Sequence, residues 1–329
     1  MIPAPAARYF VCVLSLLIAA PGSGAEWEQA ASLPEPNGGF MAGAIGSRIV
    51  VAGGTNWQND KKHWLSTTWV LDPTTSRWQP GPALPHPLAY AAFASDGNTL
   101  WIAGGTDGTT PRTEIWSLNS SLQLTRVGEL PQPALYAGGG ILGNHLHLLG
   151  GTPEIDGWEK VTTDNSAVDL RTGQLVAGNP LQGLPGGIGI PTLSAAGNRL
   201  FSFGGAWLDP TSSRVTNLAA AFEHDHASGS WKAVAPFPRA VRGLSAVALD
   251  RRTIYLAGGY GSETDGFLKA AYLYDVEQNC YHPAVPLPFA ALTSLVQCDA
   301  YVYAIAGEDR QKHRTDVCWR IPTAALRSR

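Results

Sequence analysis

Short apolar runs, each bounded by turn-forming residues, recur along the chain. Each run is too short for a helix and has the length of a β-strand. Five of the runs end in two glycines, at positions 53–54, 104–105, 150–151, 204–205 and 258–259. They read RIVVAGG, TLWIAGG, HLHLLGG, RLFSFGG and TIYLAGG. A sixth run, YVYAIAGE, ends at Glu308. The recurrence every ~50 residues indicates an internal repeat.

The sequence pattern within each repeat predicts four strands. A turn signal separates the first strand from the glycine-ended second strand, and a variable loop leads to a third strand such as TTWVLD or AAYLYD. A fourth strand ends in Leu-Pro or Phe-Pro, as in RWQPGPALP and SWKAVAPFP. One small sheet cannot bury both of its faces alone, so such units stack around an axis. We therefore predict an all-β, six-bladed β-propeller that forms a single domain over residues 26–329.

The two ends of the chain predict how the ring closes. The last repeat stops after its third strand, TDVCWRI, whereas residues 26–34, EWEQAASLP, resemble an isolated fourth strand. Pairing the two would complete the last blade and remove an exposed sheet edge. Trp78 and Trp231 recur in fourth strands, and we expect them to pack between blades.

The N-terminal segment predicts export. It has Arg8, an apolar run and then small residues before Glu26. The run is shorter than the ~20 apolar residues of a membrane span. We therefore expect residues 1–25 to be a cleaved signal peptide, which implies a periplasmic or secreted protein with no membrane anchor.

Composition narrows the candidate chemistry. The net charge of −3 in 329 residues gives no basic surface for nucleic acid. Cys12 lies in the signal peptide, and Cys280, Cys298 and Cys318 lack CxxC spacing, so we expect small buried residues rather than a zinc site.

The histidines do not predict a metal site. Four of the eight histidines form the pairs 145/147 and 224/226. Neither pair has a third metal ligand nearby in the sequence, which favours structural roles. No metal or cofactor is predicted. A copper oxidase with a cross-linked tyrosine is the weakest alternative, because no such set of residues converges on the loops.

The longer loops, between strands 2 and 3 and between strands 4 and 1, should share one face and carry function. Most ionisable residues on these loops are expected to be solvated. Glu308 differs, because we align it with the second glycine of the other repeats, at the inner end of a strand. A carboxylate partly withdrawn from water there suits proton transfer.

The segment GEDRQKHRTDV, residues 307–317, resembles the GE-x5-RTD signature of the bacterial sialic-acid mutarotases, or N-acetylneuraminate epimerases. These are periplasmic six-bladed propellers built from kelch repeats, which the repeats of this chain also resemble. The region from Gly38 to Trp116 resembles the last third of that family, and the C-terminal blade resembles its middle. This order is similar to that of the cyclically permuted mutarotases.

The resemblance implies interconversion of the α and β anomers of N-acetylneuraminic acid. It assigns Glu308 as the acid/base residue and Arg314 as the essential arginine, which could hold the substrate carboxylate. Arg112, Arg239, Arg242 and Asn56 are candidate substrate-binding residues by location. The long insertion that the family carries before its GE blade is absent, so a related acidic sugar is an alternative substrate. A non-enzymatic propeller that binds carbohydrate or protein is the alternative function.

Overall fold

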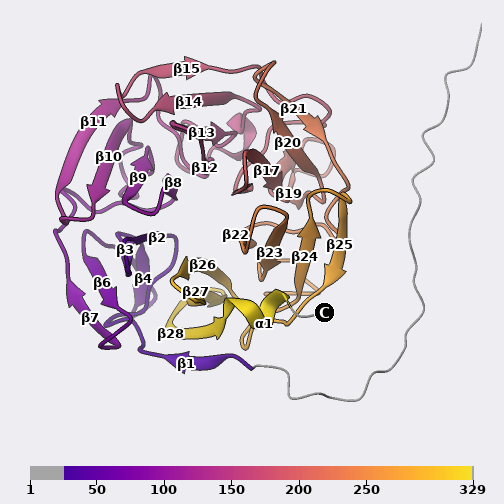
Figure 1. Ribbon diagram of the computed structural model, residues 1–329. Coiled ribbons are helices and arrows are strands. Elements are labelled where there is room, and N and C mark those ends of the chain that lie inside the picture. Colours follow the sequence, from indigo (N-terminus) through magenta and orange to yellow (C-terminus); the bar gives the residue numbers. More distant parts are fainter. Residues whose placement is uncertain (1–25, 328–329) are drawn as a thin grey trace, which may run out of the picture.

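The computed structural model describes residues 26–327, and the predicted signal peptide lies outside them. Six four-stranded antiparallel sheets surround a central axis (Figure 1). The predicted all-β, six-bladed propeller is confirmed. In each blade the first strand lies innermost and the fourth lies at the rim.

Blade 1 contains β2 (Met41–Ile45), β3 (Arg48–Ala52), β6 (Thr68–Asp72) and β7 (Arg77–Pro80). Blade 2 contains β8 (Ala92–Ser95), β9 (Thr99–Ala103), β10 (Glu114–Asn119) and β11 (Leu124–Glu129). Blade 3 contains β12 (Gly138–Leu142), β13 (His145–Leu149), β14 (Asn165–Asp169) and β15 (Leu175–Ala177).

Blade 4 contains β16 (Thr192–Ala196), β17 (Arg199–Phe203), β20 (Ala221–Asp225) and β21 (Ser230–Ala233). Blade 5 contains β22 (Ser245–Ala248), β23 (Thr253–Ala257), β24 (Ala271–Asp275) and β25 (Cys280–Pro283). Blade 6 contains β26 (Leu292–Cys298), β27 (Tyr301–Arg310), β28 (His313–Pro322) and β1 (Glu28–Ala30).

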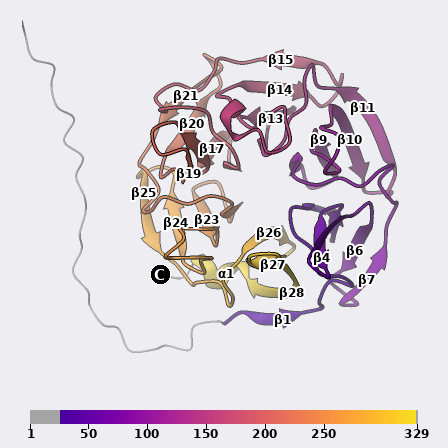
Figure 2. The same cartoon turned by 180° about the vertical axis from the view of Figure 1, so that it is seen from behind.

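Six elements of residues 26–327 lie outside the blade sheets, namely four strands and two short helices. Two of the loops between second and third strands form hairpins, β4 (Thr55–Gln58) with β5 (Lys61–Trp64) and β18 (Ala206–Asp209) with β19 (Arg214–Asn217) (Figure 2). The loop between β13 and β14 carries the 3-10 helix η1 (Trp158–Lys160). A short helix, α1 (Thr323–Arg327), follows β28.

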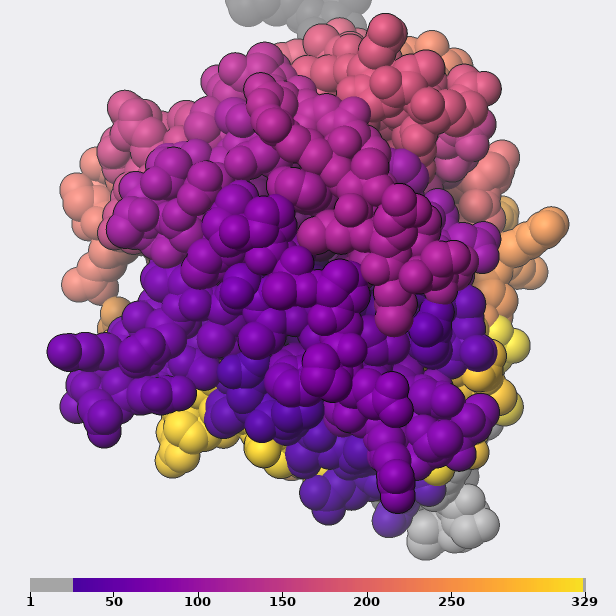
Figure 3. All heavy atoms as spheres, turned by 90° about the vertical axis from the view of Figure 1, so that its left-hand side faces the viewer, coloured from indigo at the N-terminus to yellow at the C-terminus, as the bar shows by residue number. Residues whose placement is uncertain are grey.

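The N-terminal strand closes the ring, as predicted. β1 pairs antiparallel with β28, and Glu28 lies opposite Arg320. The Arg320 Nε atom is 2.6 Å from Glu28 Oε1, which adds an ion pair at the join. Figure 3 shows N-terminal residues in indigo beside C-terminal residues in yellow. The pairing leaves β28 with a neighbour on both sides and removes an unpaired edge.

Our alignment of Glu308 with a repeat glycine was wrong. In blade 1 the two glycines have left-handed backbones, with φ of 63° at Gly53 and 108° at Gly54. The matching angles in blade 6 are 44° at Ala306 and 118° at Gly307. A Cβ on Gly307 would lie 2.0 Å from the Leu292 carbonyl oxygen, so this position requires glycine.

Glu308 therefore follows the second glycine position, where blade 1 has Thr55 and blade 5 has Tyr260. The position that departs from glycine is Ala306, which adopts the left-handed conformation with a side chain. The correction moves Glu308 one residue past the left-handed turn, to a position within β27, which continues to Arg310.

Apolar residues between neighbouring blades form the core. Trp231, only 6% exposed, packs with Leu142 and Leu149 of blade 3. Trp78 packs in the cluster between blades 1 and 6, and its indole Nε1 donates a hydrogen bond to the Ala31 carbonyl oxygen at 2.8 Å. Inter-blade packing of both tryptophans is confirmed. Cys298 and Cys318 are buried in the same cluster, and burial raises the pKa of their thiols, to about 11 and about 12.

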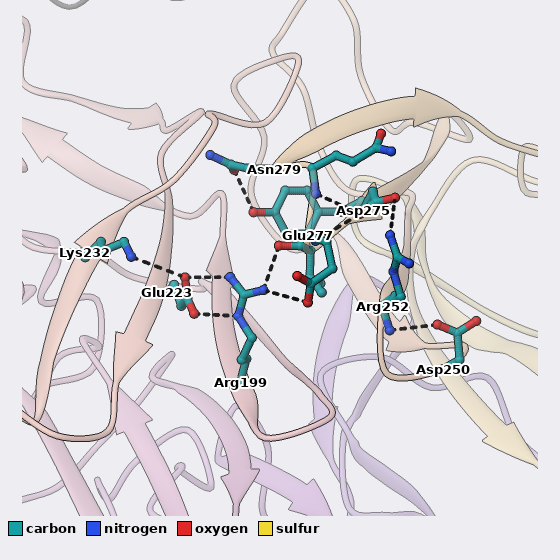
Figure 4. A network of polar contacts seen from close by, with 11 residues as sticks. Arg199, Glu223, Lys232, Asp250, Arg252, Asp275, Glu277 and Asn279 are labelled. Carbon is teal, nitrogen blue, oxygen red and sulfur yellow. Dashed lines mark hydrogen bonds and ion pairs between the residues drawn. The ribbon is translucent and has the colours of Figure 1, made fainter.

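A charged network joins blades 4 and 5 (Figure 4). Arg199 binds Glu223 through two nitrogens, at 2.6 Å and 2.9 Å, and its Nη1 atom donates to the Val276 carbonyl oxygen at 2.8 Å. Arg199 follows a turn between first and second strands, so the network lies on the face away from the longer loops. A bidentate pair of this kind fixes geometry more than an isolated surface pair does.

A histidine pair lies between blades 3 and 4. The rings of His147 and His224 are 4.5 Å apart, and His224 contacts Trp231 edge-on. Both ring nitrogens of His147 are buried without a hydrogen-bond partner. Burial, with smaller contributions from His224, His145 and His226, lowers the pKa of His147 to about 3.

Within residues 26–327, no helix has the length and hydropathy that a membrane span requires.

Closure of the ring predicts the effect of truncating Leu33. This side chain is 2% exposed in the cluster between blades 1 and 6. Leu33→Ala should lower the free energy of unfolding by about 2–5 kcal/mol, because it leaves a cavity at the join. Val176→Ala, which truncates a side chain that is 52% exposed, is the control. Equal denaturant midpoints for the two variants would contradict tight packing at the closure.

The buried histidine predicts acid sensitivity. His147 is neutral in the folded protein, whereas the unfolded chain takes up a proton below its ordinary pKa of ~6.5. Stability is therefore complete above pH ~6.5 and declines as the pH falls toward about 3. For one proton the slope is up to ~1.4 kcal/mol per pH unit.

The experiment is denaturant unfolding at a series of pH values. His147→Phe should flatten the decline, whereas His63→Gln, at an exposed site, should keep it. An unchanged slope in His147→Phe would show that other groups cause the acid sensitivity.

Candidate functional site

A cavity of about 1090 Å³ lies at the centre of the ring. Small residues of the innermost strands line its depth, including Gly43, Ala94 and Ala195. Aromatic and charged residues line one end, which we call the mouth: Tyr90, Tyr136, Trp158, Arg242, Tyr260, Glu308 and Arg314. All of these lie on connections between strands 2 and 3 or strands 4 and 1, or at the strand ends beside them. The aromatic and charged lining therefore lies on the face of the longer loops, where the sequence places the candidate function.

Close approach of the innermost strands requires small residues there. A Cβ on Gly139 would lie 2.4 Å from the backbone nitrogen of Phe93 in blade 2, so β12 and β8 meet without an intervening side chain. The small residues therefore allow the blades to pack at the axis and leave the cavity open.

The backbone at the mouth is held in an unusual conformation. Tyr90, Tyr136 and Ile190 have φ angles of 58°, 59° and 54°. A chain of hydrogen bonds crosses the blades, from Tyr90 N to Gly39 O at 2.9 Å, Tyr136 N to Tyr90 O at 3.0 Å and Ile190 N to Tyr136 O at 2.7 Å. Non-glycine residues in this region cost ~1–3 kcal/mol and persist only where their surroundings enforce them. The two tyrosine rings are consequently fixed at the mouth.

Glu308 and Arg314 form an ion pair on the cavity wall. Arg314 Nη1 lies 3.1 Å from Glu308 Oε1, and the side chains are 4% and 26% exposed. The β27–β28 hairpin brings them together, because Gly307 pairs with Thr315. A Cβ on Gly38 would lie 2.3 Å from Arg314 Cδ, so this glycine makes room for the arginine.

The buried guanidinium of Arg314 has further partners. Its Nη1 atom donates to the His313 carbonyl oxygen at 3.0 Å, and its Nη2 atom lies 3.5 Å from the Tyr90 hydroxyl. Arg314 thus lies between Glu308 and Tyr90 and contacts both.

Arg242 is a second cation on the wall. Its guanidinium stacks 4.4 Å above the Tyr260 ring, and its Nη1 atom donates to Asn217 Oδ1 at 2.8 Å. Burial lowers its pKa, although an arginine stays charged at neutral pH. Among residues 26–327, no carboxylate lies within ion-pair distance of it. Its charge is therefore available to an anion in the cavity.

Aromatic rings form much of the rest of the mouth. The Tyr90 and Tyr136 centroids are 4.9 Å apart, and Tyr136 stacks on Trp158 at 5.9 Å with an interplanar angle of 14°. On the other side, Tyr260 meets Phe267 edge-on at 5.3 Å. Such flat apolar surfaces with a few converging polar groups are typical of small-molecule sites.

The other predicted binding residues are not among those that line the cavity. Arg112 pairs with Asp107 and lies 3.8 Å from Glu114. Arg239 pairs with Asp265 at 2.8 Å. Asn56 is buried in β4, opposite His63. Arg112 and Arg239 are thus held in ion pairs, and only Arg242 of the four predicted binding residues is among those that line the cavity.

The aromatic residues of the mouth were missed in the sequence. A signal was present, since the segments HPLAY and QPALY place a tyrosine three residues after a proline at the same point of two repeats. Trp158 and Tyr260 follow second strands, at positions that only the folded connections bring to the axis. Within the described chain, no group of three or more His, Cys, Asp and Glu side chains could hold a metal ion.

Comparisons with known proteins support the repeat. A family model described as a kelch motif matches residues 37–85, which contain the strands of blade 1. Beta-scruin of Limulus polyphemus is 29% identical over 101 residues, which make up 28% of this chain and 11% of that protein. Alpha-scruin of the same organism is 31% identical over 88 residues, 25% of this chain and 9% of that protein.

The chain thus matches only about a tenth of the length of these two relatives. The motif match lies within one blade, and the sheet order extends the same unit around the whole ring. The chain is therefore a kelch-motif protein that forms a six-bladed β-propeller, with distant similarity to the scruins.

Proposed function

We propose that the protein is a mutarotase that interconverts the α and β anomers of N-acetylneuraminic acid or a related acidic sugar. The observation that carries the proposal is the ion pair of Glu308 and Arg314 on the wall of the axial cavity. The resemblance of residues 307–316 to the GE-x5-RTD signature adds to it. The proposed location, from the predicted signal peptide, is the periplasm or the outside of the cell.

The charges of the site suit an acidic sugar. Arg242 has no carboxylate within ion-pair distance among residues 26–327, and its planar guanidinium can bind the substrate carboxylate with two hydrogen bonds. The aromatic wall offers flat surfaces to the apolar faces of a sugar ring. A cavity of about 1090 Å³ has room for a monosaccharide.

Glu308 is the proposed proton-transfer group. As a carboxylate it accepts the proton of the anomeric hydroxyl, while the bond from the anomeric carbon to the ring oxygen breaks and a second donor supplies a proton to the ring oxygen. The resulting open-chain ketone recloses on its other face, and Glu308 returns the proton. Arg314 orients the carboxylate through the 3.1 Å contact. The hydrogen bond from Arg314 Nη1 to the His313 carbonyl oxygen and the pairing of Gly307 with Thr315 keep these two groups in position during the reaction.

Carbohydrate binding without catalysis is the second candidate. The aromatic wall and Arg242 would bind an acidic sugar whether or not Glu308 transferred a proton. The two functions differ in one measurable property, because only a mutarotase accelerates anomer equilibration.

Replacing the proposed acid/base residue should abolish catalysis. NMR of freshly dissolved β-N-acetylneuraminic acid should show faster equilibration with the wild-type protein present. Glu308→Gln should reduce that acceleration by ~10²–10⁴-fold, because the amide cannot exchange the proton. Glu277→Gln, on the opposite face, should keep it. Absence of acceleration by the wild type, with binding retained, would leave the binding function in place of the mutarotase.

Replacing Arg242 should weaken substrate binding. Arg242→Met should raise the Kd for N-acetylneuraminic acid by ~10–100-fold, the usual effect of losing a charge-assisted hydrogen bond. Isothermal titration calorimetry measures this, with Arg171→Met as a control in which a 70% exposed arginine is changed. The methyl ester of the sugar should bind both variants alike. Equal affinity of Arg242→Met and wild type for the free acid would remove Arg242 from the site.

A further inference from the structure

We propose that Tyr90 is the second proton-transfer group of the site and serves the ring oxygen of the sugar while Glu308 serves the anomeric hydroxyl. The proposal rests on the mutarotase function. Ring opening needs a proton removed at one oxygen and a proton supplied at another. Glu308 Oε1 is held by Arg314 at 3.1 Å, which leaves the other carboxylate oxygen for one of these two transfers.

The position of Tyr90 suits this role. It lines the cavity on the connection from β7 to β8, and its left-handed backbone and hydrogen bonds to Gly39 and Tyr136 hold it there. Its hydroxyl lies 3.5 Å from Arg314 Nη2 and 3.5 Å from Thr55 Oγ1. Glu308 and Tyr90 therefore contact different nitrogens of one guanidinium.

The surroundings of Tyr90 favour its ionised form. Lys62 Nζ lies 4.6 Å from the Tyr90 ring centroid, and Arg314 adds a second positive charge. Trp64 and Tyr136 complete the contacts of the ring, and both are uncharged. Burial by itself raises the pKa of the phenol, but the charges of Lys62 and Arg314 and the hydrogen bonds from Lys62 and Thr55 outweigh burial, so that the pKa is lowered.

Tyr136 provides an internal comparison. Its ring is only 4.9 Å from that of Tyr90 and also lines the cavity. Burial, with Tyr90 and Asp156 adding to it, raises the pKa of Tyr136. The pKa values of the two neighbouring phenols are therefore shifted in opposite directions. Arg314 lowers both, but Lys62 and its hydrogen bond act on Tyr90, whereas burial, Tyr90 and Asp156 outweigh Arg314 at Tyr136.

The proton balance of the reaction closes with these two groups. The Glu308 carboxylate takes the proton of the anomeric hydroxyl, whose oxygen becomes the ketone oxygen. The electrons of the breaking bond go to the ring oxygen, which takes the Tyr90 hydroxyl proton and becomes a free hydroxyl. On reclosure the tyrosinate removes that proton again as the oxygen attacks the other face of the ketone. Glu308 then protonates the new anomeric oxygen, and both groups return to their starting states.

The first test is kinetic. Tyr90→Phe should lower the acceleration of N-acetylneuraminic acid equilibration by ~10²-fold or more and remove one limb of its pH profile. Tyr272→Phe, in blade 5 away from the cavity, controls for loss of a phenol. Full activity and an unchanged pH profile in Tyr90→Phe would overturn the proposal.

The second test needs no activity. Ultraviolet titration should show one tyrosine that ionises below the ordinary pKa of ~10, and this transition should be missing in Tyr90→Phe. It should move to higher pH in Lys62→Met and persist in Tyr136→Phe. If Tyr90 ionises at or above its ordinary pKa, the proposal fails even where mutarotation is observed. If Tyr90 ionises early but the wild type does not accelerate equilibration, the mutarotase function fails, and the role of Tyr90 in it fails as well.

Discussion

The structure depends on the burial of sheet faces between neighbouring blades. No blade has a core of its own, because each apolar cluster is shared by two adjacent sheets, as Trp231 of blade 4 is buried against Leu142 and Leu149 of blade 3. A row of such units must close on itself, or two sheet faces would stay exposed. β1 achieves the closure by pairing with β28, and Leu33 and Trp78 fill the join between blades 6 and 1.

The site follows from that arrangement. Radial packing brings the innermost strands to the axis, where small residues such as Gly139 leave a cavity. The connections at one face then direct their side chains toward its mouth. Arg314 is the residue on which the others converge, because its buried guanidinium contacts both Glu308 and the Tyr90 hydroxyl. Tyr90 lies 224 residues before Arg314 in the sequence, and the closed ring brings the two into contact.

The arginines show how the structure divides roles that look alike in the sequence. Arg314 is engaged with Glu308, Arg112 pairs with Asp107 of its own loop, and Arg239 pairs with Asp265 of the β23–β24 connection. Arg242 alone of these stacks on an aromatic ring and lacks a carboxylate partner among the described residues. In the proposed mechanism, Arg314 therefore orients Glu308, and Arg242 binds the carboxylate of the substrate.

The sequence by itself determined the repeat, the number of blades, the closure by the N-terminal strand and the proximity of Glu308 to Arg314. These depend on local periodicity and on a hairpin whose two strands are adjacent in the chain. It did not determine how the last repeat aligns with the others. Ala306, not Glu308, occupies a glycine position there, and it adopts the left-handed conformation of a glycine. Only the tertiary structure brought Tyr90, Lys62 and Arg314 together and separated Arg242 from Arg112, Arg239 and Asn56. Contacts between distant blades depend on the direction of each side chain at the axis, which spacing along the chain does not encode.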